Sequence, residues 1–156
     1  MTDKHANLDL TGTGYCASLN FRRTSRIVTR MYDTAMQESG VRSTQFAILV
    51  GIAKLQPVAM GTLAKVLMLD SSTLTRSLRL LQKEGMIEIS KRAAMRRRFL
   101  KLTRPGEKVL QRSLPLWRAA HARFVATVGA EYWLKLRNEL ETIAKSAIMT
   151  EVTPED

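Results

Sequence analysis

The stretch Asp70-Ser71-Ser72-Thr73-Leu74-Thr75-Arg76 opens the segment that decides the fold. Asp70 or Ser71 can accept hydrogen bonds from the free N–H groups of a first helical turn, so a helix is predicted to begin here. The leucines at 74, 78 and 81 form one buried stripe on that helix, and Gly85 ends it because glycine adopts a left-handed conformation cheaply. On or near the outward face lie Ser72, Thr73, Thr75, Arg76 and Arg79.

A basic β-hairpin is predicted directly after this helix. Residues 86–90 alternate as a half-buried strand does, with Ile87 and Ile89 on one face. Residues 99–102 supply the returning strand. The link between the strands, residues 91–98, contains five cations and no anion.

Helical spacing predicts further elements on both sides of this unit. The expected helices are Tyr15–Glu38, then Gln45–Leu55 capped by Ser43 or Thr44, Met60–Leu67, a long helix from the Thr103 cap to Val128 with a kink at Pro115, and Ala130–Ile148. Residues 1–14 are expected to form a mobile arm, and residues 150–156 a frayed tail. The chain is therefore predicted to be one mainly α domain, residues 15–149, with a small β-hairpin.

Positive charge is concentrated in the same region. Between Arg42 and Arg112 there are 15 Lys and Arg against 4 Asp and Glu, which equals the net charge of +11 of the whole chain. A helix fits the major groove of duplex DNA, where Ser and Thr hydroxyls and a bidentate Arg can contact base edges. This pattern favours double-stranded nucleic acid as the partner.

Several other classes of protein are disfavoured by composition. An apolar content of 45% is typical of a folded domain, and Cys16, the single cysteine, allows no intrachain disulfide and favours a reducing cytoplasm. Residues 1–14 lack a secretory signal, and the longest apolar stretch, Phe46–Ala53, is too short to span a bilayer.

His5 and His121 are too far apart for zinc-type spacing, so no metal or other cofactor is expected. Without a phosphate loop or paired carboxylates, no catalytic residue and no enzyme is predicted.

Several motifs together resemble the MarR family of winged helix-turn-helix transcriptional regulators. They are Gly40-Val41-Arg42-Ser43-Thr44-Gln45-Phe46-Ala47-Ile48-Leu49, Leu63-Ala64, the Asp70–Arg76 stretch, Leu81, Glu84-Gly85-Met86-Ile87, and Leu102-Thr103 with Gly106. The resemblance extends from about Tyr15 to Ile148. It implies a DNA-binding lobe at about 43–103, flanking dimerisation helices at about 15–40 and 104–149, and a homodimer on a pseudo-palindromic operator. It also implies repression that a small-molecule effector or an oxidant relieves.

The resemblance and the charge pattern together define the predicted DNA contacts. In the recognition helix these are Ser71, Ser72, Thr73, Thr75, Arg76 and Arg79, and in the wing Arg92, Arg96, Arg97 and Arg98. The family wing commonly carries Asp-x-x-Asp-Arg-Arg, whereas the segment Ala93-Ala94-Met95-Arg96-Arg97-Arg98 lacks both acids. The alternative function is a non-specific basic protein that binds DNA architecturally or lies on an anionic membrane surface.

Three side chains permit a sharper interpretation. Cys16 lies where peroxide sensors of the family keep a reactive cysteine, so it is a candidate redox site. Those sensors support the thiolate with tyrosines at positions that here hold Asn20 and Arg30, and a cysteine packed at a dimer interface is the alternative. Trp117 and Trp133 are expected to anchor the dimer-forming helices, with the lining of an effector crevice as the other interpretation.

Overall fold

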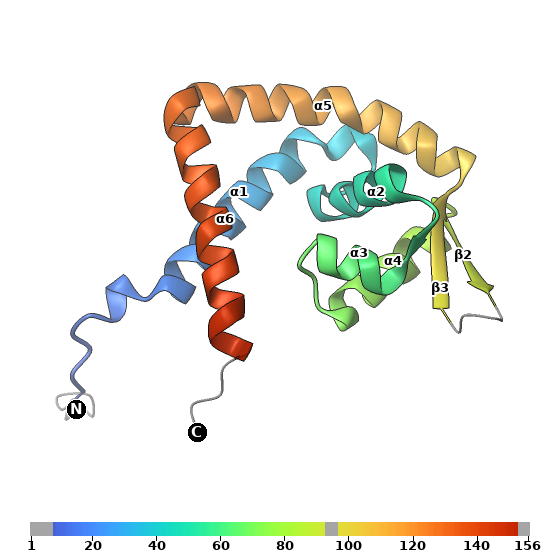
Figure 1. Cartoon of the computed structure of the whole chain (residues 1–156). Helices are drawn as coiled ribbons and strands as arrows, with labels where there is room; N and C mark the ends of the chain where they lie inside the picture. Colours follow the sequence, from blue (N-terminus) through green and yellow to red (C-terminus); the bar gives the residue numbers. More distant parts are fainter. Residues whose placement is uncertain (1–7, 93–96, 153–156) are drawn as a thin grey trace, which may run out of the picture.

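The computed structural model describes residues 8–92 and 97–152 (Figure 1). In chain order the elements are the short 3₁₀ helix η1 (Thr13–Tyr15), α1 (Ala17–Ala35), the 3₁₀ helix η2 (Gln37–Ser39), α2 (Ser43–Leu55), β1 (Val58–Ala59), α3 (Met60–Val66), α4 (Ser71–Lys83), β2 (Ile87–Arg92), β3 (Arg97–Leu102), α5 (Arg104–Val128) and α6 (Ala130–Val152). Helix α5 spans the molecule. At one of its ends lie the sheet and the helices α2 to α4, and at the other end α6 and the first half of α1 (Figure 1).

The first predicted helix is shorter than expected. Helix α1 ends at Ala35, and the chain continues through η2 to Gly40, which has a φ of 79°. Helix α6 extends to Val152, beyond the predicted end at Ile148, and α5 continues through Pro115. Residues 1–7 and 153–156 lie outside the described part, so mobility of the arm and fraying of the tail stay predictions.

The prediction that Ser43 or Thr44 caps the second helix is wrong. Helix α2 begins at Ser43, and Arg42 is its N-cap residue. The Arg42 N–H donates to Oε1 of Gln45 over 2.8 Å, and both the N–H and the hydroxyl of Ser43 donate to Oδ1 of Asp33, over 2.7 and 2.6 Å. The Asp33 carboxylate of α1 therefore accepts a free N–H at the start of α2. The two residues belong to different helices, so the pattern around Ser43 does not reveal this contact.

A short strand that the sequence did not predict completes the sheet. The strand β1 pairs antiparallel with β3, with Val58 opposite Leu100, so the strand order is β1-β3-β2. Oε1 of Gln56 accepts a hydrogen bond from the Leu102 N–H over 2.8 Å, directly before β1. Val58 and Leu100 are both buried, and the sheet therefore closes one side of the lobe.

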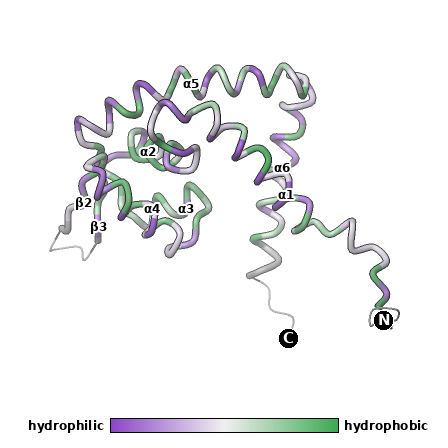
Figure 2. The backbone as a smooth tube through the Cα atoms, turned by 180° about the vertical axis from the view of Figure 1, so that it is seen from behind, coloured by the Kyte–Doolittle hydropathy of each residue, from purple (hydrophilic) through white to green (hydrophobic). Residues whose placement is uncertain are grey.

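The hydrophobic core lies in the lobe formed by α2, α3, α4 and the sheet, and the first turns of α5 cover it. The predicted stripe is confirmed, because Leu74, Leu78 and Leu81 are all buried. Figure 2 shows hydrophobic residues along α2 and α3, whereas along α5 hydrophobic and hydrophilic residues alternate, as on a helix with one packed face. Within residues 8–92 and 97–152, no helix has both the length and the apolar character needed to cross a bilayer.

Candidate nucleic-acid interface

Helix α4 presents a polar face outside the core. The Asp70 N-cap predicted from the sequence is confirmed, because its Oδ1 accepts the Thr73 N–H over 2.8 Å. Leu74, Leu78 and Leu81 fix the rotation of the helix against the lobe. Of the predicted contact residues, Ser71, Ser72, Thr73, Arg76 and Arg79 are exposed, and Thr75 is half-buried.

Most hydroxyl groups of this face already have partners within the helix. The Ser72 hydroxyl donates to Oδ1 of Asp70 over 2.5 Å, and the Thr75 hydroxyl donates to the Ser71 carbonyl over 2.6 Å. Hydrogen bonds from Ser72 and then from Thr73 hold the pKa of the Asp70 carboxyl far below its ordinary value. The carboxylate is therefore charged at neutral pH, and the long side chains of Arg76 and Arg79 are the main donors left for an external ligand.

The basic hairpin follows α4 in the predicted order. Strand β2 pairs antiparallel with β3, and the register puts Lys91 opposite Arg98 and Arg92 opposite Arg97. Four basic residues therefore occupy the end of the hairpin. Arg98 is at the start of β3, and Arg96 lies outside the described residues. Both strands are longer than predicted, since β2 extends to Arg92 and β3 begins at Arg97.

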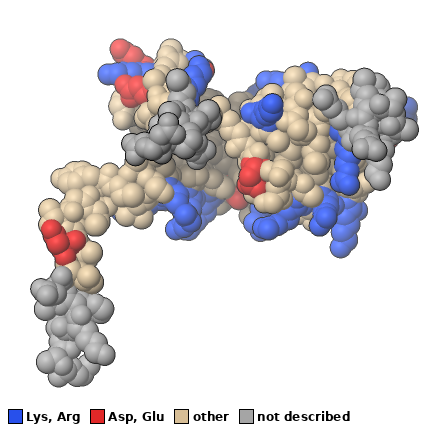
Figure 3. Space-filling model, turned by 60° about the horizontal axis from the view of Figure 1, so that its bottom comes forward, with Lys and Arg blue, Asp and Glu red and all other residues tan. Residues whose placement is uncertain are grey.

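Basic side chains gather on the side of the molecule that carries the predicted DNA contacts. Figure 3 shows Lys and Arg side chains gathered over the lobe and over α1, with few acidic side chains between them. A concave or flat face of one charge raises the local concentration of a ligand of the opposite charge. The arrangement is suited to a polyanion such as the phosphate backbone of a duplex.

The chain is similar in sequence and in structure to known proteins of one family. The family model for the MarR family matches residues 41–98, from the start of α2 to the hairpin. The M. tuberculosis transcriptional regulator MosR, solved in complex with DNA, is 31% identical, with a TM-score of 0.80 and coverage of 86% of this chain and 98% of that chain. This chain belongs to the MarR family. The predicted winged-helix fold is thereby confirmed, and so is the class of DNA-binding transcriptional regulators.

Two structures of lower identity share the MarR fold. S. aureus MepR, solved in complex with DNA, is 20% identical, with a TM-score of 0.73 and coverage of 84% of this chain and 98% of that chain. PcaV from Streptomyces coelicolor, solved with its natural ligand, is 22% identical, with a TM-score of 0.77 and coverage of 91% and 99%. No curated protein sequence matches this MarR-family chain at a significant level.

The candidate redox residue lies at the start of the first MarR helix. Cys16 is exposed and directly precedes α1, and its carbonyl accepts a hydrogen bond from the Asn20 amide over 2.9 Å. Asn20 and the exposed Arg30 hold the two positions where the peroxide sensors have tyrosines. Redox activity of Cys16 stays a prediction. Within the described residues, no group of three His, Cys, Asp or Glu side chains could hold a metal ion.

His121 joins three helices through aromatic contacts. Its Nδ1 is 2.9 Å from the Tyr32 hydroxyl on α1, and its ring stacks on Trp117 at 5.2 Å between ring centroids. The same ring meets Trp133 of α6 edge-on, at 6.2 Å between ring centroids. Desolvation raises the pKa of Tyr32 above its ordinary value of 10.0, so this phenol stays protonated. His121 is thus a half-buried residue with a polar partner.

An apolar pocket of about 420 Å³ lies beside this aromatic cluster. Its walls come from α1, α2, α5 and the end of α3, and include Tyr32, Phe46 and Trp117. Lys54 and Ser43 supply the polar groups at the pocket. Trp117 therefore both packs against Phe46, at 5.9 Å between ring centroids, and lines a cavity. An anchoring role of Trp117 in dimer formation and a role in effector binding both stay predictions.

Proposed function

We propose that this MarR-family chain acts as a homodimeric repressor that recognises a pseudo-palindromic operator in the cytoplasm. The observation that carries the proposal is the pair of exposed arginines on α4, next to a basic hairpin and over a rigid leucine stripe. We assign it no catalytic activity, no metal and no other cofactor, and no membrane partner.

Helix α4 would supply base recognition. Arg76 and Arg79 are long enough for bidentate hydrogen bonds to the O6 and N7 atoms of guanine in the major groove. Short hydroxyls at the start of the helix would accept hydrogen bonds from base edges. These residues are Ser71, Ser72, Thr73 and Thr75. The wing residues Arg92, Arg96, Arg97 and Arg98 would bind phosphates or the minor groove beside them.

Dimerisation would use the helices outside the lobe, at about residues 15–40 and 104–149. Both ends of the chain expose large apolar side chains, among them Leu19 at 57% and Ile27 at 61% on α1, and Leu134 at 58% and Ile143 at 47% on α6. An apolar surface of this kind is typical of an interface between copies. A two-fold axis would present two α4 helices to half-sites about one helical turn apart.

Relief of repression would come from a small molecule in the apolar pocket. The pocket joins lobe helices α2 and α3 to α1 and α5, so an occupant would change the angle between the lobe and the dimerisation helices. A ligand can shift this equilibrium only by its difference in affinity for the two dimer shapes. Oxidation of Cys16 is the second route to relief, and an exposed thiol is accessible to an oxidant.

Selection of genomic DNA fragments by the purified protein, at physiological salt with excess random competitor, tests the proposal. We expect a narrow set of pseudo-palindromic sites and a dimer mass by light scattering. Arg76→Ala should lose about 1–3 kcal/mol per half-site and relax the preference at one base position. Lys108→Ala, an exposed cation on α5, is the control and should bind as the wild type does. Fragments without a shared motif, or an unchanged affinity of Arg76→Ala, would contradict the proposal.

A further inference from the structure

Helix α1 carries a basic face that takes no part in the proposed recognition of bases by α4. Arg22, Arg26 and Arg30 follow one another at intervals of four, with Arg23 beside them, and all four are exposed. On an α-helix these positions lie within an arc of about 100° and span about 12 Å. No acidic residue precedes Asp33 in α1, and the Asp33 carboxylate accepts two hydrogen bonds from Ser43.

These arginines have no acidic partner among the described residues. The two ion pairs in that part of the chain are Lys135 with Glu139 and Lys145 with Glu141, and both lie on α6. Like charges spaced by four residues repel on a helix surface and destabilise it. A bound anion would remove this repulsion.

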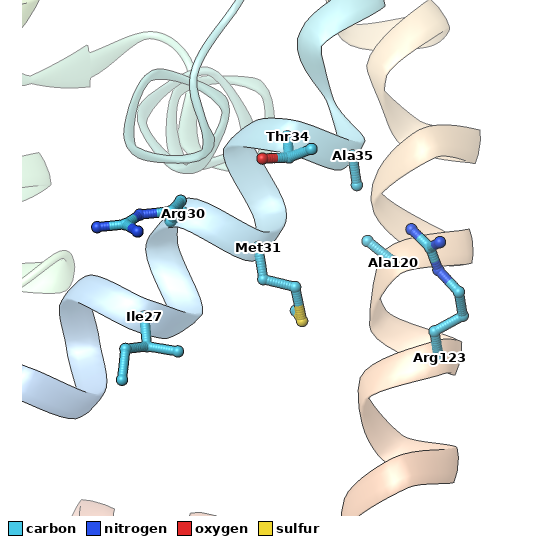
Figure 4. Close-up of a pocket in the computed structure, with 7 residues that line it drawn as sticks. All are labelled: Ile27, Arg30, Met31, Thr34, Ala35, Ala120 and Arg123. Atoms are coloured by element: carbon cyan, nitrogen blue, oxygen red, sulfur yellow. The ribbon is translucent and has the colours of Figure 1, made fainter.

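The basic face is turned away from α5. Met31 and Ala35 are half-buried on the side of α1 that packs against α5, near the buried Ala120. Figure 4 shows Met31 and Ala35 toward α5 and the Arg30 side chain directed away from it. These residues line a cavity of about 590 Å³ between the two helices. The packing against α5 therefore leaves Arg22 and Arg26 on the opposite, outer face of α1, whereas Arg30 lies at the edge of the cavity.

That outer face lies on the same side of the molecule as the predicted DNA contacts. In Figure 1, α5 lies above α1, and the hairpin extends away from α5. Figure 3, which turns that lower side forward, shows basic side chains over both α1 and the lobe. If the proposed dimer forms through α1, α5 and α6, each α1 would lie between the two lobes and next to the middle of the operator.

We propose that the basic face of α1 is a second DNA-binding surface, in which Arg22, Arg26 and Arg30 attract the phosphates of the duplex between the two half-sites. The proposal rests on the proposed homodimeric operator binding. A duplex carries one negative charge per about 1.7 Å of its axis, so a segment as long as this face offers several phosphates.

A second copy of the chain is the less suitable partner for this face. The exposed apolar side chain of Ile27 lies beside the arc of the arginines and not within it. Helix α6, which would supply the acids, already holds Glu139 and Glu141 in ion pairs with its own lysines. Phosphates supply charge without demanding a matching apolar surface.

The test compares the salt dependence of operator binding for two double variants. Arg22→Gln/Arg26→Gln removes charge from the basic face, and Lys108→Gln/Arg118→Gln removes the same charge from α5. For the first variant we expect the slope of log K against log salt to fall in magnitude by about 0.9 for each phosphate that is no longer bound, with affinity reduced equally for all sequences. The control should keep the wild-type slope, and Arg22→Lys/Arg26→Lys should also keep it, since charge rather than shape binds phosphate.

Two results would overturn the inference. One is a wild-type slope in Arg22→Gln/Arg26→Gln with helical content and dimer mass unchanged. The other is dissociation of that variant into monomers at a concentration where the Lys variant stays dimeric, which would make the face an interface between copies. Failure of the wild-type protein to select any shared motif would refute the proposed function itself, and is thus distinguishable from both.

Discussion

Gly106 leaves no space for a side chain between the first turn of α5 and the backbone of Met86. A Cβ at this position would lie 1.9 Å from the Met86 carbonyl oxygen and 2.8 Å from the carbonyl carbon. An ordinary contact between carbon and oxygen is at least about 3.3 Å, so Gly106→Ala must separate α5 from the chain before β2 by about 1.4 Å. The backbone of Met86 has no flexible end that could move aside.

That displacement would break the hydrogen bonds that start α5. The Met86 carbonyl accepts the Thr103 N–H over 3.1 Å, and the Thr103 hydroxyl accepts the Gly106 N–H over the same distance. Overpacking costs about 1–3 kcal/mol and loss of a cap about 1 kcal/mol, whereas alanine returns up to about 1 kcal/mol of helix propensity. We therefore expect Gly106→Ala to lower the free energy of unfolding by about 1–3 kcal/mol.

Thermal unfolding followed by circular dichroism measures this effect. For a chain of this size the loss corresponds to a decrease in Tm of about 2–12 °C. Gly61→Ala in α3 is the matched control, because its Cβ meets nothing within 4 Å, and it should keep or slightly raise the Tm. Both variants must be compared at one protomer concentration, since dimerisation contributes to stability. A Tm of Gly106→Ala at or above the wild-type value would refute the steric reasoning.

Three further predictions concern other local features. Met68 has a φ of 51° and is 62% exposed, so Met68→Gly should relieve left-handed strain and stabilise the chain by about 0.5–1 kcal/mol in urea unfolding. Folding lowers the pKa of Asp70 from 3.8, so its contribution to stability is complete well above that value and decreases progressively as the pH falls from 3.8 toward the lower folded pKa. The Tm difference between wild type and Asp70→Ala should therefore be smaller at pH 3 than at pH 7. Tyr32→Phe should cost about 1 kcal/mol, and a double-mutant cycle with His121→Phe should show coupling, because each change breaks the same hydrogen bond.

The sequence predicted the elements whose signals are local. The leucines of α4 repeat at helical spacing, Asp70 caps its own helix, and Gly85 has a φ of 70°, so each could be inferred from neighbouring residues. Interactions between distant residues were missed. Strand β1 exists because Val58 meets Leu100, and two residues carry no alternation that could be detected.

The functional surface likewise contains features that the local sequence predicts and features that it does not. The arginines of α4 were placed correctly on an exposed face, because one buried stripe determines the remainder of a helix. The partners of its hydroxyls, such as the Thr75 bond to Ser71, depend on side-chain rotamers that the pattern does not encode. The apolar pocket could not be inferred, since Tyr32, Phe46 and Trp117 come from three helices whose packing the sequence does not state.

The first turn of α4 has consequences for how affinity and specificity are separated in this protein. Free N–H groups at a helix start often bind phosphate, but here Asp70 accepts the Thr73 N–H and the Ser72 hydroxyl. This carboxylate is charged at neutral pH, as an aspartate of ordinary pKa also is, and it repels a phosphate at that position. Attraction to the DNA backbone must therefore come mainly from cations outside the turn, and recognition of bases from Arg76 and Arg79. Increasing salt should then weaken binding to operator and to random DNA by similar factors, while substitutions of the two arginines should change the ratio between the two affinities.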